Sequence, residues 1–269
     1  MLTYNKVFIL IISLCLSTSG SLAQGNITFS GKLEKNVFGE IILNRWQDTL
    51  AFMLSVDSSI DYMLKEAIKD QLHDFILPFK EKNEKKKNKR KLIRRLSRQV
   101  GEKYLKNYSK FSNFSQTVSH GKYDCLTSTI LYSYIFEKLQ LNYSIWETNY
   151  HIYLMVHLPK QDILIEPTDP VYGVICGEKN IKTRLEAYRK ANEKKVDTFL
   201  AEYRIERKVN FKQLLALQYY NKAVDQFNHK DFKAAMNTIK KSILVYDCDR
   251  NRGFINYSKK FAISESMLK

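Results

Sequence analysis

The stretch that decides the fold runs from Gly121 to Pro170 and reads GKYDCLTSTILYSYIFEKLQLNYSIWETNYHIYLMVHLPKQDILIEPTDP. It opens with Cys125 ahead of a run with apolar residues at helical spacing, and it continues through segments with the alternation typical of strands. His151 opens one strand and Glu166 follows the next. A cysteine, a histidine and a carboxylate are the side chains that a thiol nucleophile, its base and the group orienting that base require.

The residues after Cys125 predict a helix whose first turn holds the thiol. One face of this helix carries Leu126, Ile130, Leu131, Tyr134, Ile135 and Leu139. A thiol in the first turn is near unpaired backbone N–H groups and the positive end of the helix dipole, which both favour the thiolate. The same N–H groups can hold a developing oxyanion. The alternative is that Cys125 only packs as a small buried hydrophobic residue.

Predicted strands follow this helix at residues 143–146, 152–158 and 163–165. In the second of these, the even-numbered positions are all apolar, whereas the other face begins with His151 and also carries His157. His151 therefore lies at the start of its strand, where its side chain can reach the N-terminus of a neighbouring helix. Considered alone, a histidine at this position is more often a surface residue than a functional one.

Antiparallel pairing of the last two strands brings a carboxylate to the histidine. Because the second strand runs back along the first, Glu166 at its end returns to the side of His151. There it can orient the imidazole and stabilise its charged form. Asp169 is the second candidate for this role, unless it only forms a turn with Pro170.

This order of elements resembles the transglutaminase-like superfamily of papain-type folds. The resemblance rests on a cysteine at a helix start, a histidine at a strand start, and an acid-Pro-Thr sequence after the next strand. Here Glu166-Pro167-Thr168 stands where Asp-Pro-Thr is commoner, and Leu126 follows the cysteine where an aromatic residue often does. The resemblance implies an α+β fold, in which a helix carrying Cys125 packs on a small antiparallel sheet carrying His151 and the acid.

The resemblance also implies a function and roles for three residues. Cys125 would be the nucleophile, His151 the general base and Glu166 the orienting acid in the attack on a peptide or amide carbonyl. Water would complete hydrolysis and an amine would complete transamidation, without a metal or an organic cofactor. The alternative is a non-catalytic module that retains the fold and binds a protein or peptide in its groove.

The N-terminus predicts a secretory signal peptide over residues 1–23. Lys6 supplies the positive end, residues 7–16 form a short apolar run, and Ser21-Leu22-Ala23 offers small residues before a cleavage point. The apolar run is about ten residues, well short of the roughly 20 that span a bilayer as a helix. We therefore expect export to a periplasm or the cell exterior, with an uncleaved anchor as the alternative.

Cleavage would leave Cys125, Cys176 and Cys248. Three cysteines are too few for a disulfide scaffold, and an odd count leaves at least one thiol free or paired with another molecule. Cys176 and Cys248 could pair with each other or remain two buried thiols. Because no CxxC or HxxxH spacing occurs, the sequence does not indicate a structural zinc site.

The region before the key stretch is predicted to be mainly helical. Residues 26–43 have two glycines and no long period, so we expect an irregular or short-strand entry. Residues 44–79 have apolar side chains at helical spacing, with Ser59 as the cap of a helix that starts at Ile60 and ends at Pro78. They match the helical part that precedes the cysteine in bacterial relatives.

Three further segments complete the main domain, which we place at residues 24–205. Residues 92–105 share one apolar helical face, and residues 108–119 are polar and aromatic, as in a loop. Residues 180–208 carry many charges and few apolar anchors, and we assign them as a helix.

The last part, residues 206–269, resembles a tetratricopeptide-like helical segment. Over residues 214–246, the side chains at the packing positions of such a repeat are Tyr219, Ala223, Phe227, Phe232, Ala235, Ile239 and Ser242. A single repeat buries its apolar face only against a neighbour, so it should dock on the preceding domain or on residues 251–269. An ordinary helical hairpin is the alternative, and either could present a surface to a protein partner.

The net charge of the 269 residues is +16, and much of it is local. Residues 80–91 read KEKNEKKKNKRK and are followed by LIRRLSR. This run could meet a membrane surface or another anionic partner, or it could be a solvated lysine-rich helix. Because no aromatic residues are interleaved with the basic ones for base stacking, nucleic acid is not the expected partner.

Overall fold

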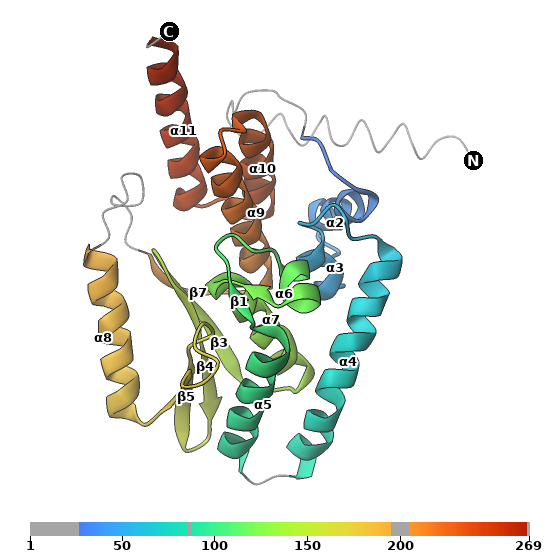
Figure 1. Ribbon diagram of the computed structural model, residues 1–269, viewed down its shortest axis with the longest axis vertical. Coiled ribbons are helices and arrows are strands. Elements are labelled where there is room, and N and C mark those ends of the chain that lie inside the picture. Colours follow the sequence, from blue (N-terminus) through green and yellow to red (C-terminus); the bar gives the residue numbers. More distant parts are fainter. Residues whose placement is uncertain (1–26, 86–87, 195–204, 268–269) are drawn as a thin grey trace.

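The structure is a computed structural model that describes residues 27–85, 88–194 and 205–267 (Figure 1). The predicted signal peptide, residues 1–23, lies outside the described residues. Within the described part, no helix has the length and apolar character needed to cross a membrane.

A five-stranded sheet lies between α8 (Glu178–Lys194) on one side and α7 (Cys125–Lys138), α5 (Lys89–Tyr104) and α4 (Tyr62–Lys85) on the other (Figure 1). Its strands are β3 (Tyr143–Thr148), β4 (Ile152–Leu158), β5 (Gln161–Ile165), β6 (Val174–Cys176) and β7 (Glu206–Val209). They are arranged in the order β6-β5-β4-β3-β7, and each neighbouring pair is antiparallel. The predicted combination of helices with a small antiparallel sheet is therefore confirmed.

Helices cover both faces of this sheet. On one face, α7 (Cys125–Lys138) packs against β4, and Leu154, Val156 and Ile163 are fully buried in the main core. On the other face, α8 (Glu178–Lys194) covers a smaller cluster around Tyr153 and Met155. Both faces of β4 are therefore buried over most of its length, including the face that begins with His151.

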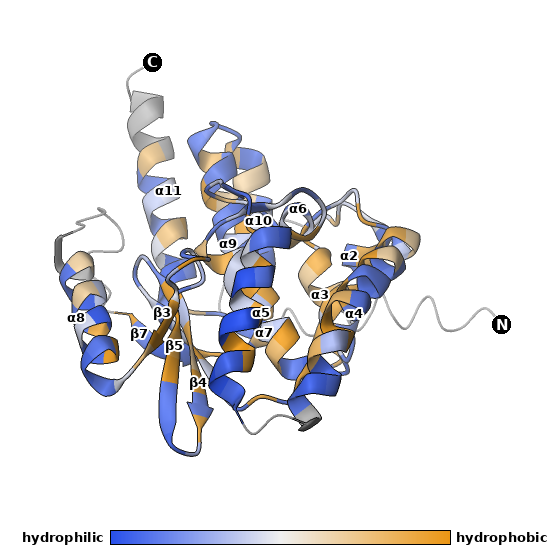
Figure 2. Cartoon of the chain, turned by 60° about the horizontal axis from the view of Figure 1, so that its bottom comes forward, coloured by the Kyte–Doolittle hydropathy of each residue, from blue (hydrophilic) through white to orange (hydrophobic). Residues whose placement is uncertain are grey.

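The helices before the sheet are α2 (Lys32–Ile42), α3 (Thr49–Leu54), α4 (Tyr62–Lys85), α5 (Lys89–Tyr104) and α6 (Phe114–His120). A two-stranded parallel sheet, formed by β1 (Asn107–Tyr108) and β2 (Lys122–Tyr123), flanks α6. The predicted helix over residues 92–105 is confirmed as α5. Figure 2 shows that α5 turns a mostly hydrophilic face outward, in keeping with a solvated basic helix.

Two predictions for residues 26–43 and 108–119 were wrong, because helices form in both. In α2, Leu33, Val37 and Ile41 recur four residues apart and are buried, so tertiary packing outweighs the glycine inside the helix. In α6, the Asn113 side chain accepts from Gln116 N at 3.0 Å, and the Gln116 side chain caps in return. This reciprocal capping starts a helix in a polar stretch that resembles a loop.

The predicted limits of the long helix α4 were also wrong. Asp61, not Ser59, caps its start by accepting from Leu64 N at 2.8 Å. Pro78 lies inside the helix and does not end it. Because Phe79 directly after the proline is buried, packing of this part of α4 compensates for the hydrogen bond that a proline removes.

The C-terminal helices are α9 (Phe211–Asn228), α10 (Phe232–Val245) and α11 (Asp249–Met267). The first two form a hairpin, α9 packs against α7 and α3, and α10 packs against α11. Strand β7 pairs with β3, and Leu214, Leu215 and Tyr219 belong to the main core. The start of this C-terminal segment therefore packs in the main core, whereas Tyr220, Ala223, Ile239, Phe254 and Ile255 form a separate cluster among α9, α10 and α11.

Candidate active site

A histidine and a carboxylate meet where β4 begins and β5 ends. Leu154 pairs with Ile165 in the sheet, so the same register brings Glu166 opposite Tyr153, and His151 lies two residues before Tyr153 at the same edge. The imidazole Nε2 of His151 lies 2.8 Å from Oε2 of Glu166. Glu166 is 5% exposed, whereas the His151 side chain keeps 20% exposure. The hairpin therefore forms the pair that its sequence predicts.

Three further donors hold the Glu166 carboxylate. Its Oε1 accepts from the Thr168 backbone N–H at 3.1 Å and from the Thr168 hydroxyl at 2.5 Å. The Tyr188 hydroxyl of α8 donates to Oε2. Burial by itself would raise the pKa of Glu166, but the hydrogen bond and charge of His151, with the two hydroxyls, lower that pKa to about 2. Glu166 is thus an ionised, fixed carboxylate at neutral pH.

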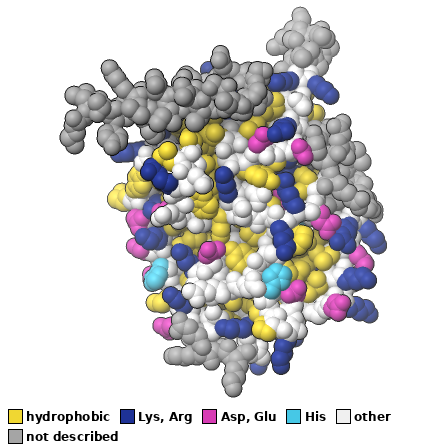
Figure 3. Space-filling view, turned by 180° about the vertical axis from the view of Figure 1, so that it is seen from behind, with side chains coloured by type: hydrophobic (Ala, Val, Ile, Leu, Met, Phe, Trp, Pro, Cys, Tyr) yellow, Lys and Arg dark blue, Asp and Glu magenta, His cyan; other side chains and the backbone are white. Residues whose placement is uncertain are grey.

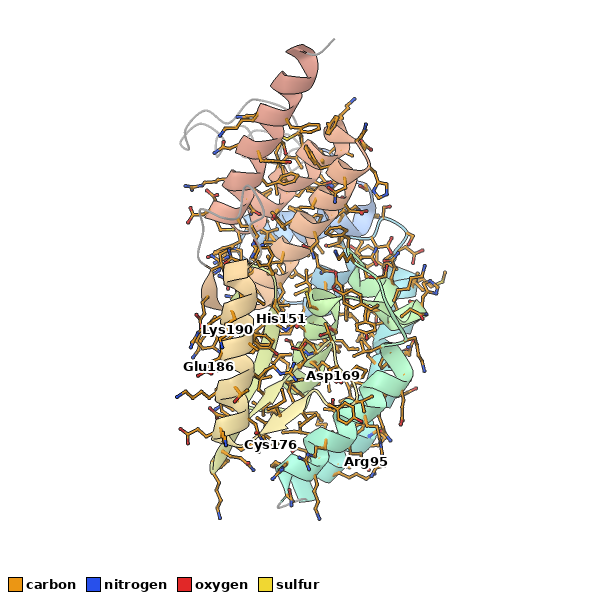
Figure 4. The ribbon with its side chains drawn as sticks, turned by 60° about the vertical axis from the view of Figure 1, so that its left-hand side comes forward. Arg95, His151, Asp169, Cys176, Glu186 and Lys190 are labelled. Carbon is orange, nitrogen blue, oxygen red and sulfur yellow. The ribbon has the colours of Figure 1, made fainter. Side chains whose placement is uncertain are left out.

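Asp169, the second candidate for the acid, has a different place. Its carboxylate accepts from the backbone N–H groups of Val171 at 3.2 Å and Tyr172 at 2.8 Å. It therefore closes the turn after Pro170, and Glu166 is the acid that contacts His151. Figure 4 shows Asp169 displaced from His151 toward the helices on the far side from α8.

The orientation of the imidazole assigns a role to each ring nitrogen. With His151 neutral, Nε2 carries the proton that Glu166 accepts, and Nδ1 keeps the lone pair of a base. The Tyr188 ring lies 4.6 Å from the imidazole centre, so α8 fixes both the acid and the base. The ring orientation is thereby set before a substrate arrives.

Cys125 is the first residue of α7, as its sequence predicts. Asp124 caps the helix: its carboxylate accepts from Thr127 N at 2.8 Å, and the Thr127 hydroxyl caps in return. Because α7 packs against β4, the helix start is directed to the strand that follows His151. In the described structure, however, no hydrogen bond joins the Cys125 thiol to the His151 imidazole.

The state of the thiol differs from the expectation. Burial, followed by the charges of Asp124 and Glu166, raises the pKa of Cys125 to about 12, although the backbone N–H groups of Leu126 and Cys125 act in the opposite direction. The helix N-terminus therefore does not outweigh burial, and the thiol is protonated at neutral pH. The charge of Glu166 is one cause of this raised pKa, in keeping with the packing of α7 against β4.

The turn before His151 is held by a residue from far along the chain. Arg250 of α11 donates to the Thr148 carbonyl at 3.0 Å and the Asn149 carbonyl at 3.2 Å, and it forms an ion pair with buried Glu147 at 3.0 Å. Thr148 in turn accepts from His151 N at 3.0 Å through its hydroxyl. The C-terminal helices thus contribute to the position of the base.

Sequence reasoning did not find the roles of Tyr188 and Arg250. Tyr188 stands out only as one of few apolar anchors in a charged helix, and nothing local indicates its contact with Glu166. Arg250 is 101 and 102 residues away from the carbonyl groups that it binds. Such contacts follow from tertiary packing and have no local sequence signal.

The three described cysteines, Cys125, Cys176 and Cys248, are all free thiols. Of the two possibilities for Cys176 and Cys248, the structure therefore has separate thiols and not a disulfide. Each is partly exposed, so the expectation that both are buried was wrong.

Comparison with known proteins adds no relative. No protein-family model, no curated protein and no solved structure matches the chain. The function is therefore argued from the chemistry of the site.

Proposed function

We propose that the chain is a transglutaminase-like thiol enzyme that acts on peptide or amide bonds, with Cys125 as nucleophile, His151 as base and Glu166 as orienting acid. The observation that carries the proposal is the 2.8 Å contact between His151 Nε2 and Glu166, a buried carboxylate held by three other donors. The proposal is further supported by the partial exposure of the imidazole, at 20%, and by a cysteine at the start of α7, a helix that packs against β4.

The chemistry begins with a protonated thiol and a neutral imidazole. As the Cys125 sulfur bonds to the carbonyl carbon, its proton passes to Nδ1 of His151, and Glu166 stabilises the resulting imidazolium. The backbone N–H groups at the start of α7 face the developing oxyanion. The imidazolium then gives its proton to the leaving amine, and an acyl thioester remains on Cys125.

A second substrate completes the cycle. His151 removes a proton from water or from an amine, which attacks the thioester carbonyl and releases the Cys125 thiolate. The thiolate then takes the proton back from the imidazolium. Water gives a carboxylic acid and an amine gives a new amide, so hydrolysis and transamidation share every group of the protein.

A second candidate function is a non-catalytic module that binds a peptide in the same place. It is favoured by the pKa of about 12 for Cys125 and by the lack of a hydrogen bond from this thiol to His151 in the described structure. A substrate carbonyl or a rotation of the thiol would have to bring the sulfur and Nδ1 together for catalysis.

Alkylation kinetics distinguish the two candidates. We would expose the protein to iodoacetamide at pH 7, map the adducts, and compare Cys125 with Cys176 as an internal reference. An enzyme is expected to label faster at Cys125 and to lose about 10²-fold or more of that rate in His151→Ala, the range for a general base. Equal labelling of both cysteines, or no effect of His151→Ala, would favour the binding module.

The proposal places this enzyme outside the cytoplasm, on the evidence of residues 1–23. Sequencing the N-terminus of the mature protein tests it: a start at Gln24 is expected, and a retained Met1 would contradict it. Partners are a protein or peptide substrate and, at α9–α11, a possible protein. Figure 3 shows Lys and Arg side chains spread over the rear face, so a membrane contact would depend on the run at residues 80–91.

A further inference from the structure

Two large apolar side chains are exposed on the loop that follows Glu166. Val171 is 74% exposed and Tyr172 is 79% exposed, which places them among the most exposed large apolar residues in the described structure. Single exposed apolar residues are common on protein surfaces, but adjacent ones beside a candidate active site are a frequent mark of ligand contact.

The loop is rigid, so this exposure is built into the fold. Glu166 N donates to Gly173 O at 2.8 Å, Gly173 N donates to Asp169 O at 2.8 Å, and the Asp169 carboxylate accepts from the N–H groups of Val171 and Tyr172. A Cβ on Gly173 would lie 2.2 Å from the Asp169 carbonyl oxygen, so only glycine allows this closure.

The loop is also fixed to α5. The Pro170 side chain lies where Gly101 has none, because a Cβ on Gly101 would be 2.4 Å from the Pro170 Cβ. This contact sets the height of the loop above the helix. Because the backbone from Pro170 to Tyr172 is held at both ends, little conformational entropy would be lost when a ligand covers its side chains.

Tyr108 provides a third exposed apolar side chain next to the thiol. It is 55% exposed, and its ring packs edge-on against Tyr123, with centroids 5.7 Å apart. Tyr108 of β1 pairs with Tyr123 of β2, and Tyr123 is two residues before Cys125, so this ring lies close to the start of α7. The loop approaches the same region, because Pro170 packs against Gly101 near the end of α5, the helix that leads into β1.

We propose that Tyr108, Val171 and Tyr172 form a subsite for an aromatic or branched apolar side chain of the substrate, next to the bond that Cys125 attacks. The inference rests on the proposed function. A rigid apolar wall beside the nucleophile gains affinity by removing a substrate side chain from water. Glu166 precedes this loop and Asp169 lies within it, so an acidic substrate side chain would be repelled.

Two alkylating reagents with the same reactive group test the subsite. Iodoacetamide probes the thiol alone, and N-benzyliodoacetamide adds an aromatic ring. At each cysteine, the rate with N-benzyliodoacetamide is divided by the rate with iodoacetamide. The measured quantity is this ratio at Cys125 divided by the same ratio at Cys176. We expect a value of about ten for the native protein, the order given by removing most of one ring from water. The Val171→Ser, Tyr172→Ser double variant should lower it about fivefold, whereas Tyr172→Phe should retain it.

Met63→Ser is the matched control, because Met63 is also 79% exposed but lies on α4. Its ratio should equal that of the native protein, and thermal melting would show that all variants are folded. A ratio that is the same in the double variant and in the control would overturn the subsite.

The same reagents separate failure of the subsite from failure of the proposed function. His151→Ala tests the function, because it should lower both rates at Cys125 and leave their ratio unchanged. If Cys125 reacts with neither reagent, the proposed function fails. The subsite is then decided by NMR: N-acetylphenylalanine amide, but not N-acetylglycinamide, should shift the signals of Tyr108 and Tyr172, and equal shifts would reject it.

Discussion

Each half of the site buries a carboxylate, but the pKa of the carboxylate is lowered in one half and raised in the other. Glu166, in the imidazole half, is 5% exposed and has its pKa lowered to about 2. Asp124, in the thiol half, is 3% exposed, and burial raises its pKa to about 6 although backbone N–H groups and the Thr127 side chain bond to it. Glu166 is bonded to an imidazole, which can carry a positive charge, whereas the donors to Asp124 are backbone N–H groups and a hydroxyl.

In the proposed reaction, this contrast would determine how charge is distributed. Burial penalises both carboxylates, and the hydrogen bond and charge of His151, with two hydroxyl donors, reverse this penalty for Glu166. The imidazole half is therefore ready to hold a positive charge, and the thiol half keeps Cys125 neutral until a base takes its proton. A proton transfer from Cys125 to His151 moves charge to the half that stabilises it.

The largest expected effect is on stability in acid, through Glu166. Its folded-state pKa is below the ordinary 4.5, so its contribution is present above pH 4.5 and is lost as the pH falls toward 2. The pKa difference corresponds to about 3 kcal/mol. Guanidinium unfolding from pH 2 to pH 7 should therefore show that Glu166→Gln removes the decline between pH 4.5 and 2. An unchanged decline would mean that the carboxylate is not ionised in the fold.

For Asp124, we expect the folding stability to change with pH in the opposite direction, over a neighbouring pH range. Its folded-state pKa of about 6 is above the ordinary 3.8, so the folded protein binds the proton more tightly and loses stability as the pH rises from about 4 to 6. This loss also amounts to at most about 3 kcal/mol. Asp124→Asn retains a good helix cap and should flatten the curve in that range. The same unfolding series measures it, and a variant that parallels the native protein would contradict the contrast.

The acid–imidazole pair should next be visible in reactivity. Replacing Glu166 by Gln removes the charge that stabilises the imidazolium, and alkylation of Cys125 by iodoacetamide at pH 7 should slow by about 10²-fold. Asp169→Asn is the control, because Asp169 binds backbone N–H groups and does not contact His151. If the two variants slow the reaction equally, the assignment of Glu166 as the acid is wrong.

How far the sequence predicts this site depends on the range of the interactions. The His151–Glu166 pair follows from the register of one hairpin, because alternation and a short turn leave little choice in how β4 and β5 pair. The helix at Cys125 follows equally from local spacing. The thiol pKa does not, because it depends on burial and on the Glu166 charge, which arrive only with the tertiary fold.

The same distinction applies to the fold. Periodicity predicts β4 and α5, but it does not show that α4 continues through Pro78 or that residues 206–209 complete the sheet. Both depend on packing against distant segments, which can outweigh local preference. The sheet boundary is set by the pairing of Glu147 with Arg207 across β3 and β7, sixty residues apart in the sequence.

Arg250 allows this long-range contribution to be measured. Arg250→Ala frees the turn before His151, and we expect alkylation of Cys125 to slow by about tenfold as the base loses its fixed position. Arg207→Ala is the matched control: Arg207 also binds Glu147, at 2.8 Å, but it does not contact the Thr148 and Asn149 carbonyls. Both variants should lose stability, and only Arg250→Ala should slow the thiol. Equal rates in the two would restrict Arg250 to a structural role.

The smallest expected effect concerns Tyr188, the one donor to the Glu166 carboxylate that α8 supplies in the described structure. Tyr188→Phe removes the hydroxyl and keeps the ring beside the imidazole, so the base stays packed while the acid loses one of its donors. Because Thr168 and His151 still hold Glu166, the rate at Cys125 should fall only about threefold, the effect of one net hydrogen bond. Tyr153→Phe provides the control, since Tyr153 also packs near the imidazole, at 6.4 Å, but contributes no hydrogen bond to the acid. A larger loss in Tyr188→Phe than in Glu166→Gln would mean that Tyr188 acts on the reaction directly and not through the acid.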